Sequence, residues 1–374
     1  MKILYIATSD VHLATFHKPY VKWLDENRVQ VDIAVEKRGD FNFEGVKNAF
    51  YLDFPRSLMN KKLFSSYKKL KQIIDSDFYD LIHCHTPIPS MLARLAAREA
   101  RKKGAKVLYT AHGFHFYKGA PLTKWLLYYT AEYFLSLFTD GIITINKEDY
   151  GYISGKMLHK SSFYIKGIGV DSNKFKPFSI NERLVKRKSI GLRNKDFVLM
   201  YVAEFISRKN HQFLIRSLND LVKIIPEIKL VLAGKGMLLD EMKQLAQELG
   251  VSEYIYFLGF RTDINELSAI ADIGISSSKH EGLGLGLAEE MMCKIPIVAS
   301  ADKGHKEMVV PGETGYLFEQ NNQKDFIKYI TLLYNDSELR YIIGEKAYLK
   351  AQEFEIANSL DSMKTIYKQY LEDL

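Results

Sequence analysis

Short apolar segments recur along the whole chain and alternate with longer stretches of mixed polarity. The segments consist of continuous runs of Val, Ile and Leu rather than apolar residues that alternate with polar ones. Continuous runs are typical of strands that are buried on both faces of a parallel sheet. We therefore predict buried strands at residues 3–7, 31–35, 80–84, 106–110, 141–145, 163–167, 197–203, 229–234, 254–259, 272–276 and 296–300.

The stretches between these segments predict helices. Residues 90–103, 210–224 and 237–249 place apolar side chains at positions i, i+3 and i+4, which form one face of a helix. Repeated strand–helix units are typical of open parallel sheets, and the predicted strands are too many for one ordinary sheet. We predict an α/β fold with two Rossmann-like, doubly wound domains that face each other across a cleft and join near the polar stretch 171–196.

The composition and the cysteine pattern set the class of protein. Of the 374 residues, 47% are hydrophobic and 26% are charged, which is average for globular proteins and sufficient for full cores. Disordered and collagen-like proteins are thereby excluded. Cys84 and Cys293 lie far apart in apolar segments, which indicates a reducing compartment rather than a disulfide framework or a zinc site.

The pattern contains neither a secretion signal nor a membrane span. The first ten residues hold a single lysine and an apolar segment too short for a signal peptide. The longest weakly charged stretch, residues 125–138, contains Glu132 and falls short of the ~20 residues that cross a bilayer. We expect a soluble, cytoplasmic protein.

The net charge of +7 is divided unequally, with +10 in residues 1–180 and −3 in residues 181–374. The excess comes largely from two basic clusters, which are Lys61, Lys62, Lys68, Lys69 and Lys71, and Arg94, Arg98, Arg101, Lys102, Lys103 and Lys106. Either these residues form solvated helix faces, or the first half docks on the anionic inner face of the cell membrane. In the second interpretation an apolar stripe of Phe64, Tyr67 and Leu70 or Lys71 would face the lipid. In the first, the stripe would pack into the core of the domain and the lysines would be solvated.

The sequence HEGLGLGLAEEMM at residues 280–292 follows a predicted strand. Its three glycines allow backbone amides to approach an anion closely, and a helix begins near residue 287. A helix amino terminus after a glycine loop suits a phosphate group, because its N–H groups and its dipole favour negative charge. Glu281 and Glu289 flank the loop, and a carboxylate can accept two hydrogen bonds from the diol of a ribose. A tight turn whose acidic residues stabilise the helix dipole would give the same pattern.

The sequence AEFISRKNH at residues 203–211 directly follows another predicted strand. Arg208 and Lys209 therefore stand beyond a strand end and ahead of a helix. There a lysine provides a compact positive charge, and an arginine can bind two oxygens of a diphosphate. Taken alone, a basic pair at a surface is more often simply solvated.

Together these motifs resemble the carboxyl-terminal domain of glycosyltransferase family 4. The resemblance rests on the Glu281-x7-Glu289 element, on Lys209, on GFR at 259–261 and on GETGYLF at 312–318. The first half is similar to the same family in the segments FHKPYVKWL (16–24), YDLIHCHTP (79–87), TAHGFHFYKGAP (110–121), TINKEDY (144–150) and GIGVDSNKF (167–175). The resemblance covers most of the chain and is nearest to the bacterial branch that builds exopolysaccharide or capsule repeat units.

The resemblance implies a retaining glycosyltransferase of GT-B fold. It implies an acceptor-side domain at residues 1–175, a donor-binding domain at 176–352 and a last helix at 353–374 that crosses back to the first domain. The expected substrates are a nucleotide sugar, for which we favour a UDP-sugar, and a glycan or polyprenyl-diphosphate-linked acceptor. No nucleic acid partner is expected.

The resemblance also assigns roles in the donor site. The side chains of Arg208 and Lys209 would neutralise the donor diphosphate. The backbone amides of Leu283, Gly284, Leu285 and Gly286 would bind its β-phosphate. The Glu289 carboxylate would hold the ribose diol. Gly259, Phe260 and Arg261 would line the base, largely through backbone groups. Glu281 would contact hydroxyls of the donor sugar.

His112 follows a predicted strand and matches the histidine of the family that reaches the sugar and the leaving phosphate. Two features depart from the family. Much of the family has an arginine five residues before the lysine, where this chain has Glu204, so we expect Arg208 to supply the second cation. The usual glycine-rich first loop is also missing, and contacts there would come from His12, His17 and Lys18.

The implied chemistry uses no metal and no other cofactor, because a lysine, a helix amino terminus and backbone amides already meet the charge of the leaving diphosphate. His83 and His85 alternate along one strand and could hold a metal, but we expect them to be core or cleft histidines. Three alternatives belong to other classes. They are a UDP-sugar epimerase, a phosphorylase, which would need a lysine for pyridoxal phosphate, and a non-catalytic sugar-binding protein, which would need a secretion signal.

Overall fold

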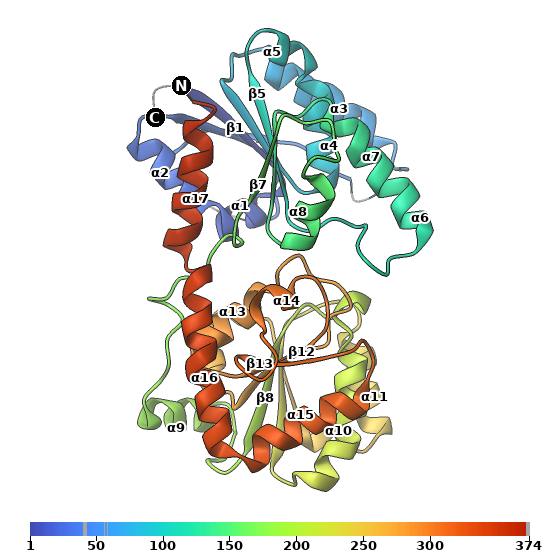
Figure 1. Ribbon diagram of the computed structural model, residues 1–374, viewed down its shortest axis with the longest axis vertical. Helices are drawn as coiled ribbons and strands as arrows, with labels where there is room; N and C mark the ends of the chain where they lie inside the picture. The colour runs from blue at the N-terminus through green and yellow to red at the C-terminus, as the bar shows by residue number, and fades with distance from the viewer. Residues whose placement is uncertain (40–42, 56, 58, 372–374) are drawn as a thin grey trace. The chain divides into compact units, whose positions relative to one another are not determined.

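The computed structural model describes residues 1–39, 43–55, 57 and 59–371. The chain forms two compact units, of which the first combines Met1–Ile168 with Ala357–Leu374 and the second is Gly169–Ile356. Each unit contains one parallel sheet packed with helices (Figure 1). Within the described part of the chain, no helix has both the length and the apolar character required to cross a membrane.

The sheet of the first unit has seven parallel strands in the order β3-β2-β1-β4-β5-β6-β7. The strands are β1 (Lys2–Ser9), β2 (Gln30–Glu36), β3 (Val46–Tyr51), β4 (Leu81–His85), β5 (Lys106–Ala111), β6 (Gly141–Thr144) and β7 (Ser161–Tyr164). The strand order reverses between β1 and β4, which makes this the topological switch point of the unit. The loops that follow β1, β4 and β5 therefore meet at one edge of the sheet.

The helices of the first unit connect these strands in sequence order. They are α1 (Asp10–Phe16), α2 (Lys18–Glu26), α3 (Lys62–Asp75), α4 (Pro87–Ala96), α5 (Arg98–Lys102), α6 (Leu122–Lys124), the π-helix η1 (Trp125–Tyr129), α7 (Thr130–Ser136), α8 (Lys147–Ile153) and the last helix α17 (Ile356–Lys368). Helices α3, α4 and α7 lie on the same side of the unit (Figure 1).

Two places were open for the apolar stripe of α3, the lipid or the core, and the structure places Leu70 in the core. Leu70 is fully buried and packs with Ile74 into the core of the first unit, against residues of β1 and β4. Phe64, by contrast, is 65% exposed. One face of α3 is therefore part of the core, because burying its apolar side chains removes them from water.

Arg94 of the second basic cluster is also not a surface residue. Its side chain is fully buried, and its guanidinium donates to the Glu132 carboxylate at 2.7 and 3.3 Å. The Arg94 guanidinium also lies 4.3 Å from the centre of the Tyr109 ring. A buried arginine needs such a bidentate partner to offset its lost hydration.

The sheet of the second unit has six parallel strands in the order β10-β9-β8-β11-β12-β13. The strands are β8 (Phe197–Val202), β9 (Ile228–Ala233), β10 (Ile255–Gly259), β11 (Ile273–Ser276), β12 (Ile297–Ser300) and β13 (Gly315–Phe318). Here the order reverses between β8 and β11. Ligands of such sheets bind beyond the carboxyl ends of the strands at the reversal.

The helical segments of the second unit include three single turns of 3₁₀-helix. They are α9 (Ile180–Ser189), η2 (Ser207–Lys209), α10 (His211–Ile224), α11 (Leu239–Glu248), η3 (Ser252–Tyr254), α12 (Ile264–Ala269), α13 (Leu285–Met292), α14 (His305–Met308), α15 (Gln323–Asn335), α16 (Ser337–Ala351) and η4 (Gln352–Phe354).

The structure confirms the predicted fold of two doubly wound α/β units, and each predicted apolar segment overlaps a strand. The overlap is smallest for residues 163–167, because β7 ends at Tyr164 and its residues are only half-buried at the sheet edge. The additional strands β3 and β13 lie at sheet edges, and most residues of β3 are exposed. The polar stretch 171–196 contains the helix α9. Its amino terminus is a capping box of Ser179 and Glu182, and its Arg187 is buried against Asp272 at 2.7 Å.

Candidate functional site

The reversal between β8 and β11 brings two loops of the second unit together. The loop after β8 carries Arg208 and Lys209 on η2, and the loop after β11 carries Glu281. Asn210 adopts a left-handed conformation with φ 56°, which turns the chain from η2 into α10. The Tyr201 hydroxyl at the end of β8 donates to the Lys209 carbonyl at 3.0 Å and so fixes this turn.

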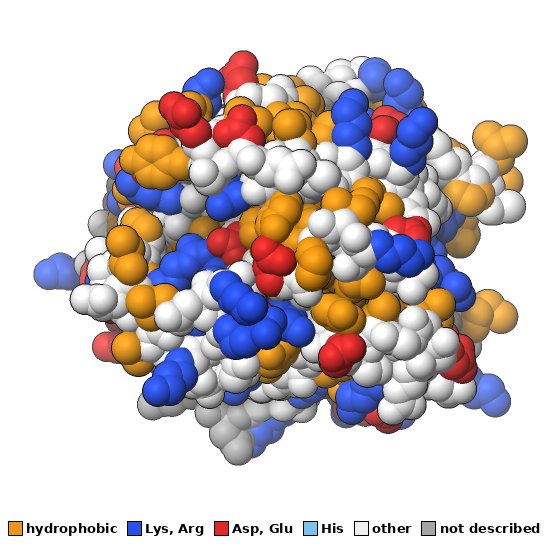
Figure 2. All heavy atoms as spheres, turned by 90° about the horizontal axis from the view of Figure 1, so that it is seen from below, with side chains coloured by type: hydrophobic (Ala, Val, Ile, Leu, Met, Phe, Trp, Pro, Cys, Tyr) orange, Lys and Arg blue, Asp and Glu red, His pale blue; other side chains and the backbone are white. Residues whose placement is uncertain are grey.

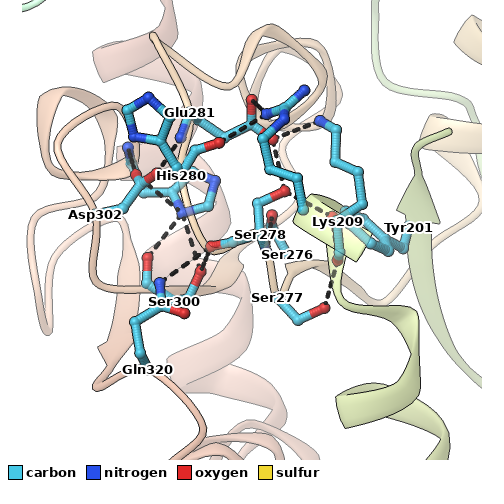
Figure 3. A network of polar contacts seen from close by, with 12 residues as sticks. Tyr201, Lys209, Ser276, Ser277, Ser278, His280, Glu281, Ser300, Asp302 and Gln320 are labelled. Atoms are coloured by element: carbon cyan, nitrogen blue, oxygen red, sulfur yellow. Dashed lines mark hydrogen bonds and ion pairs between the residues drawn. The ribbon is translucent and has the colours of Figure 1, made fainter. Parts of the chain in front are cut away.

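Glu281 is the centre of the polar network in Figure 3. Its carboxylate accepts from Lys209 Nζ at 2.5 Å, from an Arg208 guanidinium nitrogen at 2.8 Å and from the Ser278 hydroxyl at 2.6 Å. Burial would raise the pKa of Glu281, but the charges of Lys209 and Arg208 outweigh burial and hold the pKa at about 2. Glu281 is therefore a permanent carboxylate that holds both cations at one place.

Serines that follow β11 tie this network to the sheet. The Ser277 hydroxyl donates to the carbonyls of Lys209 and Asn210 at 3.0 and 2.9 Å. The Ser278 hydroxyl lies 2.9 Å from the Tyr201 hydroxyl. On the far side, Asp302 accepts from the backbone N–H of Glu281 (Figure 3). The position of the Glu281 carboxylate is thus set by neighbours on both sides.

The glycine loop leads into α13 as expected, with the helix beginning at Leu285. Gly284 has a φ of 92°, and a side chain there would also approach the His305 ring at 3.0 Å, so glycine is required on both counts. A β-carbon on Gly286 would lie 3.8 Å from the Val202 carbonyl oxygen at the end of β8. The amino terminus of α13 therefore lies beside the loop that carries Lys209.

Glu289 lies on α13 and is half-buried. Burial raises its pKa to about 7, and the charge of Lys174 opposes this only weakly. A carboxyl group with this pKa can be present in either protonation state near neutral pH. Glu289 and Glu281 are thus electrostatically different, although the sequence shows them as a matched pair.

The segment Gly259–Arg261 follows β10, and Gly259 has a φ of 64°. The Arg261 guanidinium binds Asp263 at 2.6 and 2.8 Å, so this side chain is engaged within the loop. Phe260 is 68% exposed, and Lys235 Nζ lies 5.1 Å from the centre of its ring. The segment offers backbone groups and one aromatic face.

A second glycine loop, Gly234–Gly236 after β9, packs closely against the segment that follows β8. A β-carbon on Gly234 would lie 2.0 Å from the Ala203 carbonyl oxygen, and one on Gly236 would lie 2.5 Å from the Phe205 carbonyl oxygen. Both positions also have a positive φ, of 154° and 158°. The loop is present in the sequence as Gly-x-Gly directly after an apolar segment.

In the first unit, the structure brings His12 and His17 together with His112. His112 directly follows β5, His12 lies on α1 and His17 lies between α1 and α2. The centre of the His112 ring lies 5.0 Å from that of His12 and 5.7 Å from that of His17. Lys18, which was predicted to act with them, is exposed at the start of α2.

His83 and His85 belong to the same histidine cluster, on β4. The two ring nitrogens of His83 lie 2.8 Å from the Tyr367 hydroxyl and 2.8 Å from the Thr110 hydroxyl, so His83 is a satisfied core histidine. His85 Nδ1 lies 3.3 Å from His112 Nε2.

The chain contains one Asp-x-Asp tripeptide, Asp75-Ser76-Asp77, a motif that binds divalent cations in some enzymes. Asp75 pairs with Lys71 at 2.6 Å, and Asp77 pairs with Lys2 at the amino end of β1. The tripeptide therefore lies at the edge of the sheet opposite to the histidine cluster.

Two family models match this chain. “Glycosyl transferases group 1” matches residues 182–350, and “Glycosyl transferase 4-like” matches residues 2–146. The first match contains the network around Glu281, and the second contains all five residues of the histidine cluster, which are His12, His17, His83, His85 and His112.

Known proteins match over most of the chain. It is 41% identical over 374 residues to “Putative glycosyltransferase EpsD” of Bacillus subtilis (strain 168), which covers 99% of this chain and 97% of that protein. It is 28% identical over 312 residues to UDP-Gal:alpha-D-GlcNAc-diphosphoundecaprenol alpha-1,3-galactosyltransferase of Escherichia coli, which covers 82% of this chain and 79% of that protein.

Solved structures show the same fold. Anabaena HepE in complex with UDP and glucose matches with a TM-score of 0.80 and 21% identity, over 98% of this chain and 99% of that one. Sucrose-phosphate synthase from Thermosynechococcus elongatus matches with a TM-score of 0.81 and 18% identity, over 100% of both chains.

Proposed function

Because the chain belongs to glycosyltransferase family 4, we propose that it transfers a sugar from a UDP-sugar to a lipid-linked acceptor in exopolysaccharide or capsule assembly, with retention of the anomeric configuration. Glycosyltransferase activity follows from family membership, and the fold is GT-B. The observation that carries the donor site is the placement of two cations on Glu281 beside the amino terminus of α13.

The donor diphosphate is proposed to bind at Arg208, Lys209 and the backbone amides of residues 283–286. Two cations and a helix amino terminus provide positive potential at one point, which is what a diphosphate requires. The engagement of Arg208 with the same carboxylate as Lys209 supports Arg208 as the second cation, while Glu204 is exposed. HepE, which shares the fold, has been crystallised with UDP and with UDP-glucose.

The remaining donor contacts follow the family resemblance. Glu281 contacts sugar hydroxyls, Glu289 holds the ribose diol, and the segment Gly259–Arg261 lines the base. Engagement of Arg261 by Asp263 supports recognition of the base through backbone groups. The resemblance assigns His112 to the sugar and the leaving phosphate, and His12, His17 and Lys18 to the acceptor side.

We propose that transfer needs no metal. The leaving UDP gains negative charge at its β-phosphate, and preorganised cations and amides stabilise such charge without a bound ion. Lys209 is held by Glu281 before the donor arrives, so little reorganisation accompanies the reaction. Both carboxylates of the Asp-x-Asp tripeptide are paired with lysines.

A lipid-linked acceptor would bring the enzyme to a membrane surface, and we propose that the first unit docks there. The proposed surface carries Lys61, Lys62, Lys68, Lys69 and Lys71 at α3, together with the exposed Phe64. The second basic cluster lines a hollow of mixed charge, in which Arg98, Arg101, Lys102, Lys106 and Lys160 stand with Glu99 and Asp140. Exposed apolar side chains lie along the neighbouring segment 122–137, and they are Leu122, Leu126, Leu127, Phe134 and Leu137. Apolar residues beside cations are typical of surfaces that bind anionic lipid. The face in Figure 2, by contrast, intersperses basic, acidic and hydrophobic side chains.

The experiment that tests this function starts with a thermal-shift screen of nucleotide sugars. A donor at 100 times its dissociation constant adds about 2.7 kcal/mol of stability. The donor that binds is then supplied in radiolabelled form with a polyprenyl-diphosphate-linked sugar, and the anomeric configuration of the product is determined by NMR. Stabilisation by no UDP-sugar, or inversion at the anomeric carbon, would contradict the proposal.

A further inference from the structure

Half of the ten histidines of the chain gather at one edge of the first sheet. They follow β1, lie on β4 or follow β5, and they are His12, His17, His83, His85 and His112. The ring centres of His17 and His85 are 4.1 Å apart, and those of His83 and His85 are 4.2 Å apart. The donor site uses none of the ring nitrogens of this cluster except, on the proposed function, those of His112.

The ring nitrogens of the cluster are not all satisfied by protein groups. His83 bonds to Tyr367 and Thr110, and His85 bonds to His112. The Nε2 atoms of His12, His17 and His85 are buried and have no hydrogen-bond partner among the described residues. An unpaired buried nitrogen is unfavourable, so those of His12 and His17, which lie in one group with His112, indicate a ligand that supplies their partner.

The donor atoms narrow the class of ligand. His12, His17 and His112 each offer one ring nitrogen as a possible ligand atom. Neutral imidazole is the form that binds metal ions, and it prefers zinc, copper, nickel and iron to magnesium, calcium and manganese.

The geometry fits one ion. One ligand nitrogen each from His12, His17 and His112 can be chosen so that all three lie within 4.8 Å of one another. A zinc ion bound at 2.0–2.1 Å would hold them about 3.4 Å apart, which is inside this limit. A cavity of about 10 Å³ adjoins His17, His85 and His112, which is about the space of one water molecule.

We propose that His12, His17 and His112 form a binding site for one divalent transition-metal ion of the zinc class. His85 supports the site through its contact with the His112 ring, as outer groups commonly orient metal-binding histidines. Three protein ligands leave the fourth position of a tetrahedral ion open. A further consequence rests on the proposed function of His112 in sugar transfer. Because bound metal would occupy His112, it inhibits this transfer.

The site is tested by metal titration of the untagged full chain after dialysis against chelator. Calorimetry should show one Zn²⁺ per chain and no comparable binding of Mg²⁺, and Co²⁺ should give the visible absorption of a tetrahedral site. His12→Gln and His112→Gln should each weaken Zn²⁺ binding by more than about tenfold. His159→Gln, a histidine of the same unit that bonds to Ser162, is the matched control and should bind as the unmodified chain does.

Circular dichroism without metal shows whether each variant folds, and because His12 and His112 are both only half-buried, either variant alone suffices if the other does not fold. Binding that is absent, that is not stoichiometric, or that is unchanged in His12→Gln and His112→Gln overturns the site. Stoichiometric binding without loss of transfer leaves the site and overturns inhibition. A chain that transfers no sugar contradicts the proposed function, and the titration still tests the metal site.

Discussion

Lys209 Nζ lies 2.5 Å from a carboxylate oxygen of Glu281, and the two residues come from loops that follow neighbouring strands of the second sheet. The carboxylate holds the ammonium at the carboxyl edge of the sheet, beside the amino terminus of α13. A diphosphate bound there would share this cation with Glu281. Kinetic and binding measurements on Lys209 and Glu281 variants can therefore separate the role of the cation from that of the carboxylate.

We predict that Lys209→Ala lowers kcat by roughly 10²–10³ and raises the KM for the donor much less. The reason is that Lys209 stabilises charge that develops on the leaving phosphate, so its effect is larger in the transition state than in the ground state. Steady-state kinetics with the identified donor measures both constants. A normal kcat would remove Lys209 from the reaction. Arg208→Ala should also lower kcat, and a silent effect would show that Arg208 does not supply the second cation.

The roles of Glu281 and Glu289 should differ when the binding of UDP alone is compared with sugar transfer. Glu289→Ala should weaken UDP binding, because the ribose diol loses its acceptor. Glu281→Ala should leave UDP affinity undiminished while transfer collapses, because its proposed partner is the sugar and its removal frees two cations. Calorimetry with UDP measures the first property and a transfer assay the second. Equal loss of UDP affinity in both variants would contradict the division of roles.

Glu281 should also contribute to stability in a pH-dependent way. Its pKa is depressed from 4.5 to about 2 in the folded chain, which corresponds to roughly 3 kcal/mol. This contribution is present above pH 4.5 and is lost as the pH falls toward 2. Urea unfolding should therefore show a deficit of Glu281→Gln at pH 7 that shrinks at pH 3. Glu241→Gln, at an exposed position on α11, should show no such change.

The fold could be predicted because the buried strands are continuous apolar segments, which two-sided burial demands. Strand β3 lacked that signal because it is an edge strand with exposed side chains. Helix α9 was hidden because its residues are mostly polar, and what stabilises it is a capping box and the buried pair of Arg187 and Asp272. Such long-range pairs have no periodic signature in a sequence.

The candidate site was predicted where a residue stands next to a strand end, as Lys209 and Glu281 do. The sequence did not show that Arg208 and Lys209 share one carboxylate, because this depends on the register of β8 with β11. It also presented Arg94 as one more surface cation, although Glu132 is its partner 38 positions away. Close approaches such as that of Gly234 to Ala203 are likewise tertiary.

Transfer activity should survive exhaustive treatment with EDTA. The leaving diphosphate is met by Arg208, Lys209 and backbone amides, and none of these depends on an ion. If zinc is carried along from expression, chelation should raise the activity rather than lower it, since His112 is released. Complete loss of activity that Mg²⁺ or Mn²⁺ restores would contradict the metal-free mechanism. The transfer assay with and without EDTA provides the measurement.

The first unit should bind vesicles that contain anionic lipid, which flotation measures directly. Each lysine near an anionic surface contributes up to about 1 kcal/mol, so replacing Lys61, Lys62, Lys68, Lys69 and Lys71 by Gln should reduce flotation strongly. Binding should also weaken as salt rises to a few tenths molar, because screening shortens the reach of these charges. Leu126→Ser, at a side chain 76% exposed, tests the apolar contribution, and Met237→Ser, 86% exposed in the second unit, is its matched control. Equal flotation with neutral and anionic vesicles would contradict this docking surface, as would full binding by the five-lysine variant.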